Sequence, residues 1–593
     1  MGKNLSITVV SILAILLKAC FSGNLLSSEN NSKDPGGISL SYTIPSKISL
    51  GEAISFTPAM SRVETGIFSV NPSLPVGLSI DSSTGIISGT STSPVGSQSY
   101  TVSFDGNNVT ASNDINFSVE KFFTIDTNSD STDSNPGNGV CADSSGDCSL
   151  RAAIEESNAT PSYPGKIAVP PNTYVIGSTM LTITSNLEIA STLPGTPFTV
   201  SATGFTYPNA TIFEVLGSSK NIDVSISDVN FSSVPNLDLG YLVVGAAISV
   251  NQANSFNLKN CNISSNNRTW AGSPGLVSSL GLVMINSGTL TIDDCDFDSN
   301  TVYSSLNAGA VLKIDSTDNL IIKNSSFTNN GGSAQGGTAY VRVSNSVVIE
   351  NSNFVGNFVD SDNTFSAGAA LFLDSPRLEI DSSFFSNNTG AQHKGSAIAI
   401  YNSDVVLITN STFSENPAGI GVLYLYNPDA IDIENTTIYM GTSPANLYIL
   451  IETLVPTILN LNHVTTDGYI ARIGSSSSVT VNIANSVLAA SNKTNCSTGG
   501  TITFNSLGHN ITTSDADGCG SFNNTGDSTD TDPLLVAGAP LDNGGKVPSI
   551  ALQAGSPALD IIPAGICSST PTDKIGASRT SETSCDSGAL ESP

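Results

Sequence analysis

A phrase of six residues recurs ten times between Ile226 and Leu488, and it constrains the fold more strongly than any other feature of the sequence. Each copy opens on an aliphatic residue and carries phenylalanine or another apolar residue in its sixth place. Successive copies begin 24 to 34 residues apart, a period typical of a solenoid or a propeller. We place the first residues of the copies at Ile226, Leu258, Ile292, Ile322, Ile349, Ile380, Ile408, Ile433, Leu459 and Ile483.

The residues inside one period decide between these two folds. They form short apolar strands separated by Asn, Gly and Ser, with almost no helical periodicity. A propeller blade needs about 40 residues and four antiparallel strands, which is more than one period offers. A parallel β-helix instead stacks equivalent residues of successive coils, with aliphatic side chains inside and polar side chains at the corners. The sequence therefore predicts an all-β protein built mainly on a parallel β-helix.

Two columns of side chains are expected from this stacking. The third place of the phrase is mostly Asn or Asp, and we expect these side chains at a corner, hydrogen-bonded from coil to coil. This corner ladder comprises Asp228, Asn260, Asp294, Asn324, Asn351, Asn410, Asn435 and Asn485. The phenylalanines of the sixth place are expected inside the coil. This core ladder comprises Phe231, Phe297, Phe327, Phe354, Phe385 and Phe413.

A second kind of segment alternates with the phrase. It begins with small residues, as in A-G-A-V-L-K-I at Ala308 and A-G-A-A-L-F-L at Ala367, and five of the phrases run on as F-x-x-N. From the residues alone, F-x-x-N predicts a buried phenylalanine followed by a corner asparagine. Over residues 245–440 the interleaving resembles the polymorphic outer-membrane protein family, whose passenger domains are right-handed β-helices implicated in adhesion. The resemblance implies a right-handed coil and an adhesive role.

The amino terminus, residues 1–20, reads as an export signal. Lys3 precedes an apolar run from Leu5 to Leu17, which is short for a membrane span, and the run ends in L-K-A-C. This ending resembles a lipoprotein lipobox in which Cys20 is acylated, although Lys18 departs from the usual small or apolar residue. Ordinary cleavage near Gly23 is the alternative. Residues 21–36 are polar and predict a flexible tether reaching roughly 22 Å.

Residues 37–120 contain short alternating strands separated by Gly, Pro, Asn and Asp, which predicts a β-sandwich. The stretch from Leu74 to Thr90 reads L-P-V-G-L-S-I-D-S-S-T-G-I-I-S-G-T, with a tight turn expected at Asp81–Gly85. It resembles the signature of a bacterial immunoglobulin-like domain. Such domains serve as passive spacers or as binding modules at cell surfaces, and both roles stay open.

Residues 121–165 are expected to cap the first coil. In C-S-L-R-A-A-I-E-E-S-N-A, Ser149 is a suitable N-cap for an amphipathic helix that shields the open coil end. The phrase resembles the C-S-L-R-E-A motif of a family of secreted right-handed β-helix proteins, with Ala152 in place of Glu. The same resemblance extends through the β-helix, residues 166–505, to a carboxy-terminal cap, residues 506–593. It implies a fold and no activity.

Eight cysteines remain once Cys20 is set aside, an even number suited to disulfides in an exported protein. Cys261 and Cys295 hold the fourth place of adjacent phrases, so stacking would bring them within disulfide reach. Neighbouring cysteines along the chain suggest three further pairs. The predicted bridges are Cys141–Cys148, Cys261–Cys295, Cys496–Cys519 and Cys567–Cys585.

Charge and side-chain chemistry limit the function. With 21 basic and 50 acidic residues the net charge is −29, which excludes nucleic acid as a partner. Asp126, Asn128 and Asp130 have the spacing of a calcium loop, but Ser131 replaces the required glycine, so metal binding stays open. A polysaccharide lyase or hydrolase needs converging carboxylates. The densest acidic cluster is Asp293, Asp294, Asp296 and Asp298, and strand alternation splits it.

We therefore expect a non-enzymatic lipoprotein without a cofactor, exported to the bacterial outer membrane or cell surface. Its lipid anchor would attach the protein to the membrane. Its β-helix would form a rod that adheres to a host or matrix protein or to a glycan. A polysaccharide-degrading enzyme and a purely structural envelope component are the alternatives.

Overall fold

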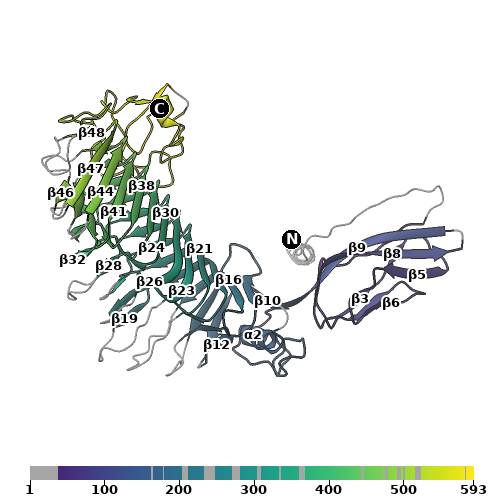
Figure 1. The fold of residues 1–593 in the computed structure, drawn as a ribbon. Helices are drawn as coiled ribbons and strands as arrows, with labels where there is room; N and C mark the ends of the chain where they lie inside the picture. Colours follow the sequence, from purple (N-terminus) through teal and green to yellow (C-terminus); the bar gives the residue numbers. More distant parts are fainter. Residues whose placement is uncertain are drawn as a thin grey trace, which may run out of the picture. The chain divides into compact units, whose positions relative to one another are not determined.

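The computed structural model divides the chain into two compact units, Met1–Pro170 with Ser185–Thr192 and Pro171–Thr184 with Leu193–Pro593. Figure 1 shows the ribbon of both units. In the described part, no helix has the length and apolar character needed to cross a membrane. Cys20 and the predicted tether lie outside the described residues. The structure describes residues 38–107, 109–161, 165–177, 179–202, 211–232, 247–269, 281–303, 309–332, 336–359, 367–441, 447–467, 469–473, 478–489, 496–498, 501–513, 522–580 and 583–592.

The first unit contains the predicted β-sandwich. One sheet pairs β5, β8 and β9 antiparallel, with β2 parallel to β9, and a second sheet pairs β3, β7 and β6. Their apolar faces enclose aromatic side chains that include Phe68, Tyr100 and Phe104. The strands are β1 (Leu40–Ser41), β2 (Lys47–Ser49), β3 (Ala53–Phe56), β4 (Ala59–Met60), β5 (Gly66–Asn71), β6 (Leu78–Ile80), β7 (Ile87–Thr90), β8 (Val95–Gly106) and β9 (Val109–Thr124).

The expected turn between β6 and β7 forms around Asp81. Its carboxylate accepts hydrogen bonds from the backbone N–H groups of Ser83 and Thr84, at 2.9 and 2.8 Å. Gly85 adopts φ +72°, and a Cβ there would lie 2.7 Å from the ring of Phe68. Only glycine suits this position, because both the backbone conformation and the packing exclude a side chain.

Strand β9 continues past the sandwich and pairs in parallel with β10 (Gly165–Val169), which in turn pairs with β13 (Leu187–Ser191). Helix α2 (Leu150–Ala159) forms where the C-S-L-R-A-A phrase predicts it, and the Ser149 hydroxyl caps it by accepting from Ala152 N–H at 3.0 Å. The Lys121 ammonium donates to the carbonyls of Ser157 and Thr160 at the end of the helix, at 2.6 and 3.2 Å. These bonds fasten the helix to the beginning of the first coil.

The second unit is the predicted parallel β-helix, in which each coil contributes one strand to each of three parallel sheets. Sheet 1 contains β12 (Leu181–Ile183), β15 (Phe213–Leu216), β17 (Ile248–Asn251), β20 (Leu282–Ile285), the first halves of β23 (Leu312–Lys323) and β26 (Ala339–Glu350), β29 (Leu371–Asp374), β33 (Ile398–Tyr401), β37 (Leu423–Tyr426), β40 (Leu447–Glu452), β43 (Tyr469–Ile473) and β46 (Cys496–Thr498).

Sheet 2 carries the beginning of each six-residue phrase. It contains the first halves of β16 (Asp223–Ser232), β18 (Ser255–Ser264) and β21 (Thr289–Asp298), the second halves of β23 and β26, then β30 (Arg377–Asp381), β34 (Val405–Thr409), β38 (Ala430–Glu434), β41 (Thr457–Asn462), β44 (Ser478–Ala484) and β47 (Thr501–Gly508).

Sheet 3 carries the end of each phrase. It contains β11 (Thr173–Ile176), β14 (Phe198–Ala202), the second halves of β16, β18 and β21, then β24 (Ser326–Thr328), β27 (Asn353–Val355), β31 (Phe384–Ser386), β35 (Thr412–Ser414), β39 (Thr437–Tyr439), β42 (Thr465–Thr466), β45 (Val487–Leu488) and β48 (Ile511–Thr512).

Short strands outside the three sheets complete the unit. They are β19 (Asn267–Thr269), β22 (Thr301–Tyr303), β25 (Gly331–Gly332), β28 (Phe358–Val359), β32 (Gly390–Lys394) and β36 (Ala418–Ile420) beside the coils, and β49 (Ile562–Pro563) and β50 (Ser584–Cys585), with helix α3 (Ala564–Cys567), near the carboxy terminus.

The register of sheet 2 follows the six-residue phrase in nine of the ten copies. The exception is the copy placed at Leu459, because Leu461 is the residue paired with both Ile433 and Ile483. Leu459 and Leu461 both point inward, so apolar alternation alone does not separate them. The corrected register puts His463 in the corner place of this coil, where it adopts φ +51°.

Candidate functional site

The eight predicted corner residues share one unusual backbone conformation. All of them have φ between +45° and +56°, the left-handed region that Asn and Asp tolerate better than other residues with a side chain. Some amides bond along the column, as Asn351 does to Asn324 at 3.3 Å. Others bond diagonally, as Asn410 does to Asp381 at 2.7 Å. The shared left-handed backbone conformation therefore defines this column, whereas the side-chain hydrogen bonds differ from coil to coil.

The asparagines of F-x-x-N lie inside the coil and not at the expected corner. The left-handed corner residue is one place earlier, as at Asn329 and Asn387. Within the ladder, Asn357 Nδ2 donates to Asn388 Oδ1 at 3.0 Å and to the Phe327 carbonyl at 2.9 Å. Each amide is thus satisfied by the neighbouring coils, as a buried polar group must be. The asparagines of this inner ladder are at most 1% exposed and comprise Asn300, Asn330, Asn357, Asn388 and Asn416.

The core ladder of phenylalanines is continuous over five coils. Rings from Phe297 to Phe413 stack with centroids 4.7 to 5.0 Å apart and interplanar angles of 12° or less. Phe231 occupies the same column but stands apart, because Ile263 occupies the coil between it and Phe297. Its ring instead meets Phe213 edge-on at 6.1 Å.

Three of the predicted disulfides are present in the described part of the chain. Cys261 and Cys295 bridge adjacent coils with Cα atoms 4.5 Å apart. Later coils place a buried serine at this position, as at Ser325, whose hydroxyl accepts from Cys295 N–H at 3.1 Å. Cys519 lies outside the described residues, so the predicted Cys496–Cys519 bridge is not among those described. The bridges formed are Cys141–Cys148, Cys261–Cys295 and Cys567–Cys585.

The acidic clusters are held by protein groups. Asp293 lies 3.6 Å from the Lys259 ammonium, and hydrogen bonds led by the Thr328 hydroxyl lower the pKa of Asp298. In the acidic loop whose spacing is that of a calcium loop, Asp130 pairs with Arg151 at 2.7 Å and Asp126 accepts from Cys148 N–H at 2.7 Å. Over the described residues, no group of three or more His, Cys, Asp or Glu side chains could hold a metal ion.

A cluster of aromatic side chains lies on the outer side of sheet 1, and we call it the outer aromatic face. Tyr340 stacks on Phe372 at 5.0 Å, Phe372 meets Tyr401 at 4.9 Å, and Tyr401 meets both Tyr424 and Tyr426 at 5.5 and 5.6 Å. Tyr340, Phe372 and Tyr424 are buried, whereas Tyr401 and Tyr426 remain partly exposed. The sequence reasoning missed this cluster, although its signal is visible as aromatic residues after the small-residue segments.

Charged groups border the outer aromatic face in opposite pairs. The Lys394 ammonium lies 4.7 Å from the centre of the Tyr424 ring and 2.6 Å from Glu452, and the Tyr424 hydroxyl donates to Glu452 at 2.8 Å. Burial, together with Glu452, raises the pKa of Tyr424, so the phenol stays protonated and cannot serve as a base. Arg342 lies 3.5 Å from Asp374 on the opposite border.

A second assembly joins the carboxy terminus to the coils. Residues 522–580 and 583–592, which we call the C-terminal strap, run beside sheet 3 and its corner. Their contacts reach from the His509 carbonyl, 2.9 Å from the Ser587 hydroxyl, to Asn351, 2.7 Å from the Lys546 ammonium. A Cβ on Gly588, which has φ +99°, would lie 2.7 Å from the Thr465 hydroxyl. The strap therefore lies closely against the coils.

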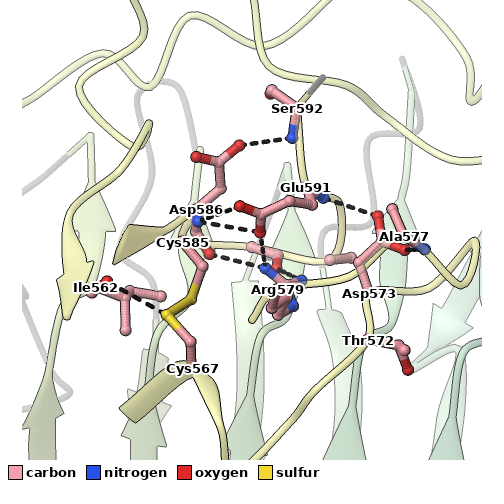
Figure 2. Close-up of polar contacts among 12 residues, drawn as sticks. Ile562, Cys567, Thr572, Asp573, Ala577, Arg579, Cys585, Asp586, Glu591 and Ser592 are labelled. Carbon is pink, nitrogen blue, oxygen red and sulfur yellow. Dashed lines mark hydrogen bonds and ion pairs between the residues drawn. A yellow bond between two sulfur atoms is a disulfide. The ribbon is translucent and has the colours of Figure 1, made fainter. Parts of the chain in front are cut away.

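Charged groups of the strap contact one another, as Figure 2 shows, and Arg579 Nη2 also donates to Asn435 Oδ1 of a coil at 3.4 Å. The Arg579 guanidinium is buried and donates to Glu591 at 2.8 Å and to the Asp586 and Gly588 carbonyls at 2.9 and 2.8 Å. Burial raises the pKa of Glu591 to about 7 in spite of this pairing. Asp573 accepts from the backbone of Glu591 at 2.8 Å. These contacts make the cluster a structural clamp.

His463 lies beneath this clamp. Its side chain is 0% exposed, and neither ring nitrogen hydrogen-bonds to a described residue, although the Gly588 backbone lies beside it. Burial, followed by the charge of Arg579, lowers the pKa of His463 well below its ordinary value. Nearby, buried Lys574 donates to the Ser411 carbonyl at 2.9 Å, and burial lowers its pKa as well.

Comparison with known families assigns both folds. Residues 246–438 match the family model described as a right handed beta helix region. The coil is right-handed. Residues 24–128 match the family model described as "Putative Ig domain". No curated protein and no solved structure matches the chain. The matched β-helix region contains Tyr340, Phe372, Tyr401, Tyr424 and Tyr426 of the outer aromatic face.

Proposed function

We propose that the chain is a lipid-anchored bacterial envelope protein whose right-handed β-helix binds an extracellular protein or glycan. The observation that carries this proposal is the outer aromatic face, where Tyr401 and Tyr426 are partly exposed on a parallel sheet. Partly exposed aromatic rings beside polar groups are typical of binding surfaces. The immunoglobulin-like domain and the β-helix also support an extracellular surface protein.

The export and anchoring part of the proposal rests on the amino terminus. Residues 1–20 have the pattern of a signal ending in a lipobox, with Cys20 as the acylated residue. The resemblances to the C-S-L-R-E-A and polymorphic outer-membrane families also favour a secreted or surface location. The Cys261–Cys295 bridge supports an oxidising compartment, since disulfides persist outside the cytosol.

We propose binding in preference to catalysis. Asp293 and Asp298 are each engaged by neighbouring side chains, and Asp294 occupies a corner with a left-handed backbone. A glycoside hydrolase needs two carboxylates facing one bond, and a lyase needs a free base beside its substrate. The protonated Tyr424 phenol and the paired Lys394 of the outer aromatic face do not meet that need.

Two measurements test the proposal. Metabolic labelling with a fatty-acid analogue should mark the wild type and leave Cys20→Ser unmarked, and protease treatment of intact cells should degrade the β-helix. Purified protein should then bind members of an array of matrix proteins and glycans. Binding to none of them, with full exposure on cells, would favour a purely structural role. Release of unsaturated or reducing sugar products would favour the enzyme.

A further inference from the structure

We propose that the outer aromatic face binds a neutral glycan chain lying along the β-helix axis, with Tyr401 and Tyr426 as its aromatic contact. This inference rests on the proposed function and names its ligand class. Tyr401 and Tyr426 are register partners in adjacent coils, and their ring centroids lie 5.6 Å apart. The two rings are tilted by 40° against each other, so together they form one partly exposed aromatic contact in the path of a chain that follows the axis.

Tyr401 is held in place by its neighbours before a ligand arrives, and Tyr426 packs against it at 5.6 Å. Tyr401 is packed against Phe372 at 4.9 Å and against Tyr424 at 5.5 Å, and both of these neighbours are buried. A ring fixed in this way loses little conformational entropy on binding. Each tyrosine offers an apolar ring and a hydroxyl, which matches the C–H face and the hydroxyl groups of a pyranose.

The polar groups around the rings favour a ligand without charge. Lys394 is 2.6 Å from Glu452 and Arg342 is 3.5 Å from Asp374, so each cation already has a carboxylate beside it. Among the described side chains, Lys313 is a further cation of this face; it is buried 5.9 Å from the centre of the Tyr340 ring, and burial lowers its pKa. An acidic polysaccharide would also meet the net charge of −29.

The same face is poorly suited to a protein partner. A protein interface of standard size covers about 800 Å² on each side and is centred on aromatic anchors that enter pockets of the partner. Three of the five rings in this cluster are already buried against their own neighbours. Two rings in register with paired charges on the border match a narrow extended chain better than a broad protein surface.

The test compares four forms of the full mature chain: the wild type, Tyr401→Ala/Tyr426→Ala, Tyr401→Phe/Tyr426→Phe, and Tyr439→Ala. Tyr439 is a partly buried tyrosine on sheet 3 and serves as the matched control. Circular dichroism verifies folding. Calorimetry then measures binding of neutral hexasaccharides (β-1,4-glucan, β-1,3-glucan and α-mannan), acidic polygalacturonate and hyaluronate oligosaccharides, and collagen and fibronectin.

Binding of a neutral hexasaccharide should fall about tenfold or more in the double alanine variant, and remain within about threefold of wild type in the phenylalanine and Tyr439 variants. Neutral binding that is unchanged in the double alanine variant would overturn the site. Binding only of acidic oligosaccharides or of a matrix protein, lost in the same variant, would overturn the ligand class and leave the proposed function standing. Binding of nothing in the panel would overturn both.

Discussion

Replacing His463 with asparagine should make the β-helix and its strap less sensitive to acid. The imidazole is completely buried in a corner whose neighbouring coils carry Asn435 and Asn485. Asparagine suits the left-handed backbone at this corner and does not titrate. The variant therefore removes one buried titratable group and keeps the conformation that the coil requires.

The sign and size of the effect follow from the lowered pKa of His463. In the unfolded chain the imidazole takes up a proton near pH 6.5, whereas the folded state takes it up only well below that value. Stability is therefore complete above pH 6.5 and is lost as the pH falls, by up to about 1.4 kcal/mol per pH unit. Between pH 7.5 and 4.5 the wild type should lose up to about 3 kcal/mol more than His463→Asn.

Glu591 acts in the opposite direction. Its pKa is raised to about 7, so the folded state takes up this proton first, and the corresponding stabilisation is present at low pH and lost as the pH rises through 7. The pH dependence of the wild type alone therefore mixes both groups. The difference between wild type and His463→Asn isolates the histidine, because Glu591 is present in both proteins.

Urea unfolding at four pH values between 7.5 and 4.5 measures this difference, with circular dichroism as the signal. Hydrogen exchange of peptides from residues 570–592, corrected for the intrinsic rate at each pH, reports whether the strap leaves first. Ser382→Asn is the matched control, since it also places asparagine at a left-handed corner but removes no titratable group. Parallel stability curves for wild type and His463→Asn over this range would refute the reasoning.

Three further changes test the ladders and the strap. Asn357→Ala should lower the free energy of unfolding in urea by about 3 kcal/mol or more, because it leaves buried amides of adjacent coils without a hydrogen-bond partner. Asn402→Ala, at an exposed corner, should lower it by about 1 kcal/mol. Equal losses in the two variants would contradict the inner ladder. Arg579→Met should lower the free energy of unfolding by about 3 kcal/mol and make the strap more sensitive to chymotrypsin. Adding Glu591→Leu should restore most of the lost stability, because no buried charge is then left unpaired. If stability is not restored, the ion pair is not what holds the strap. Cys567→Ser opens a bridge between residues 18 positions apart and should lower the free energy of unfolding by about 2–3 kcal/mol. Reductant should lower the stability of the wild type to that of the variant. An unchanged unfolding midpoint would contradict a role of this bridge in stability.

The sequence predicts most of the coil because each coil repeats the same local demands. Inward aliphatic residues and left-handed corners impose a period that is visible without coordinates, and the stacking of Phe297 on Phe327 follows from register alone. The Cys261–Cys295 bridge has the same origin, since equivalent places in adjacent coils must lie close together. These features depend on short-range order, and a single sequence contains that information.

The contacts that break the repeat are the ones the sequence does not predict. The strap places Lys546 beside Asn351, 195 positions away in the chain, and no periodic signal links the two residues. The copy of the phrase predicted to begin at Leu459 begins at Leu461. Its corner residue is a histidine in place of the usual asparagine, so apolar alternation was the only remaining guide to the register. The inner asparagine ladder was misplaced by one residue because Asn also occurs at the adjoining corner, as at Asn329 and Asn387.

In a solenoid, only the outward side chains are free to take a role beyond folding, and the three sheets differ in how they use them. On sheet 2 the outward amides bond to one another, as Asn460, Asn482 and Asn505 do over consecutive coils. On sheet 3 the strap covers the outward side near Thr412 and Thr465. Sheet 1 instead gathers aromatic rings that the coil does not need, since its interior is already filled by aliphatic residues. Side chains that folding leaves unused are the best candidates for selection by a ligand, which is why we propose binding on the outer aromatic face.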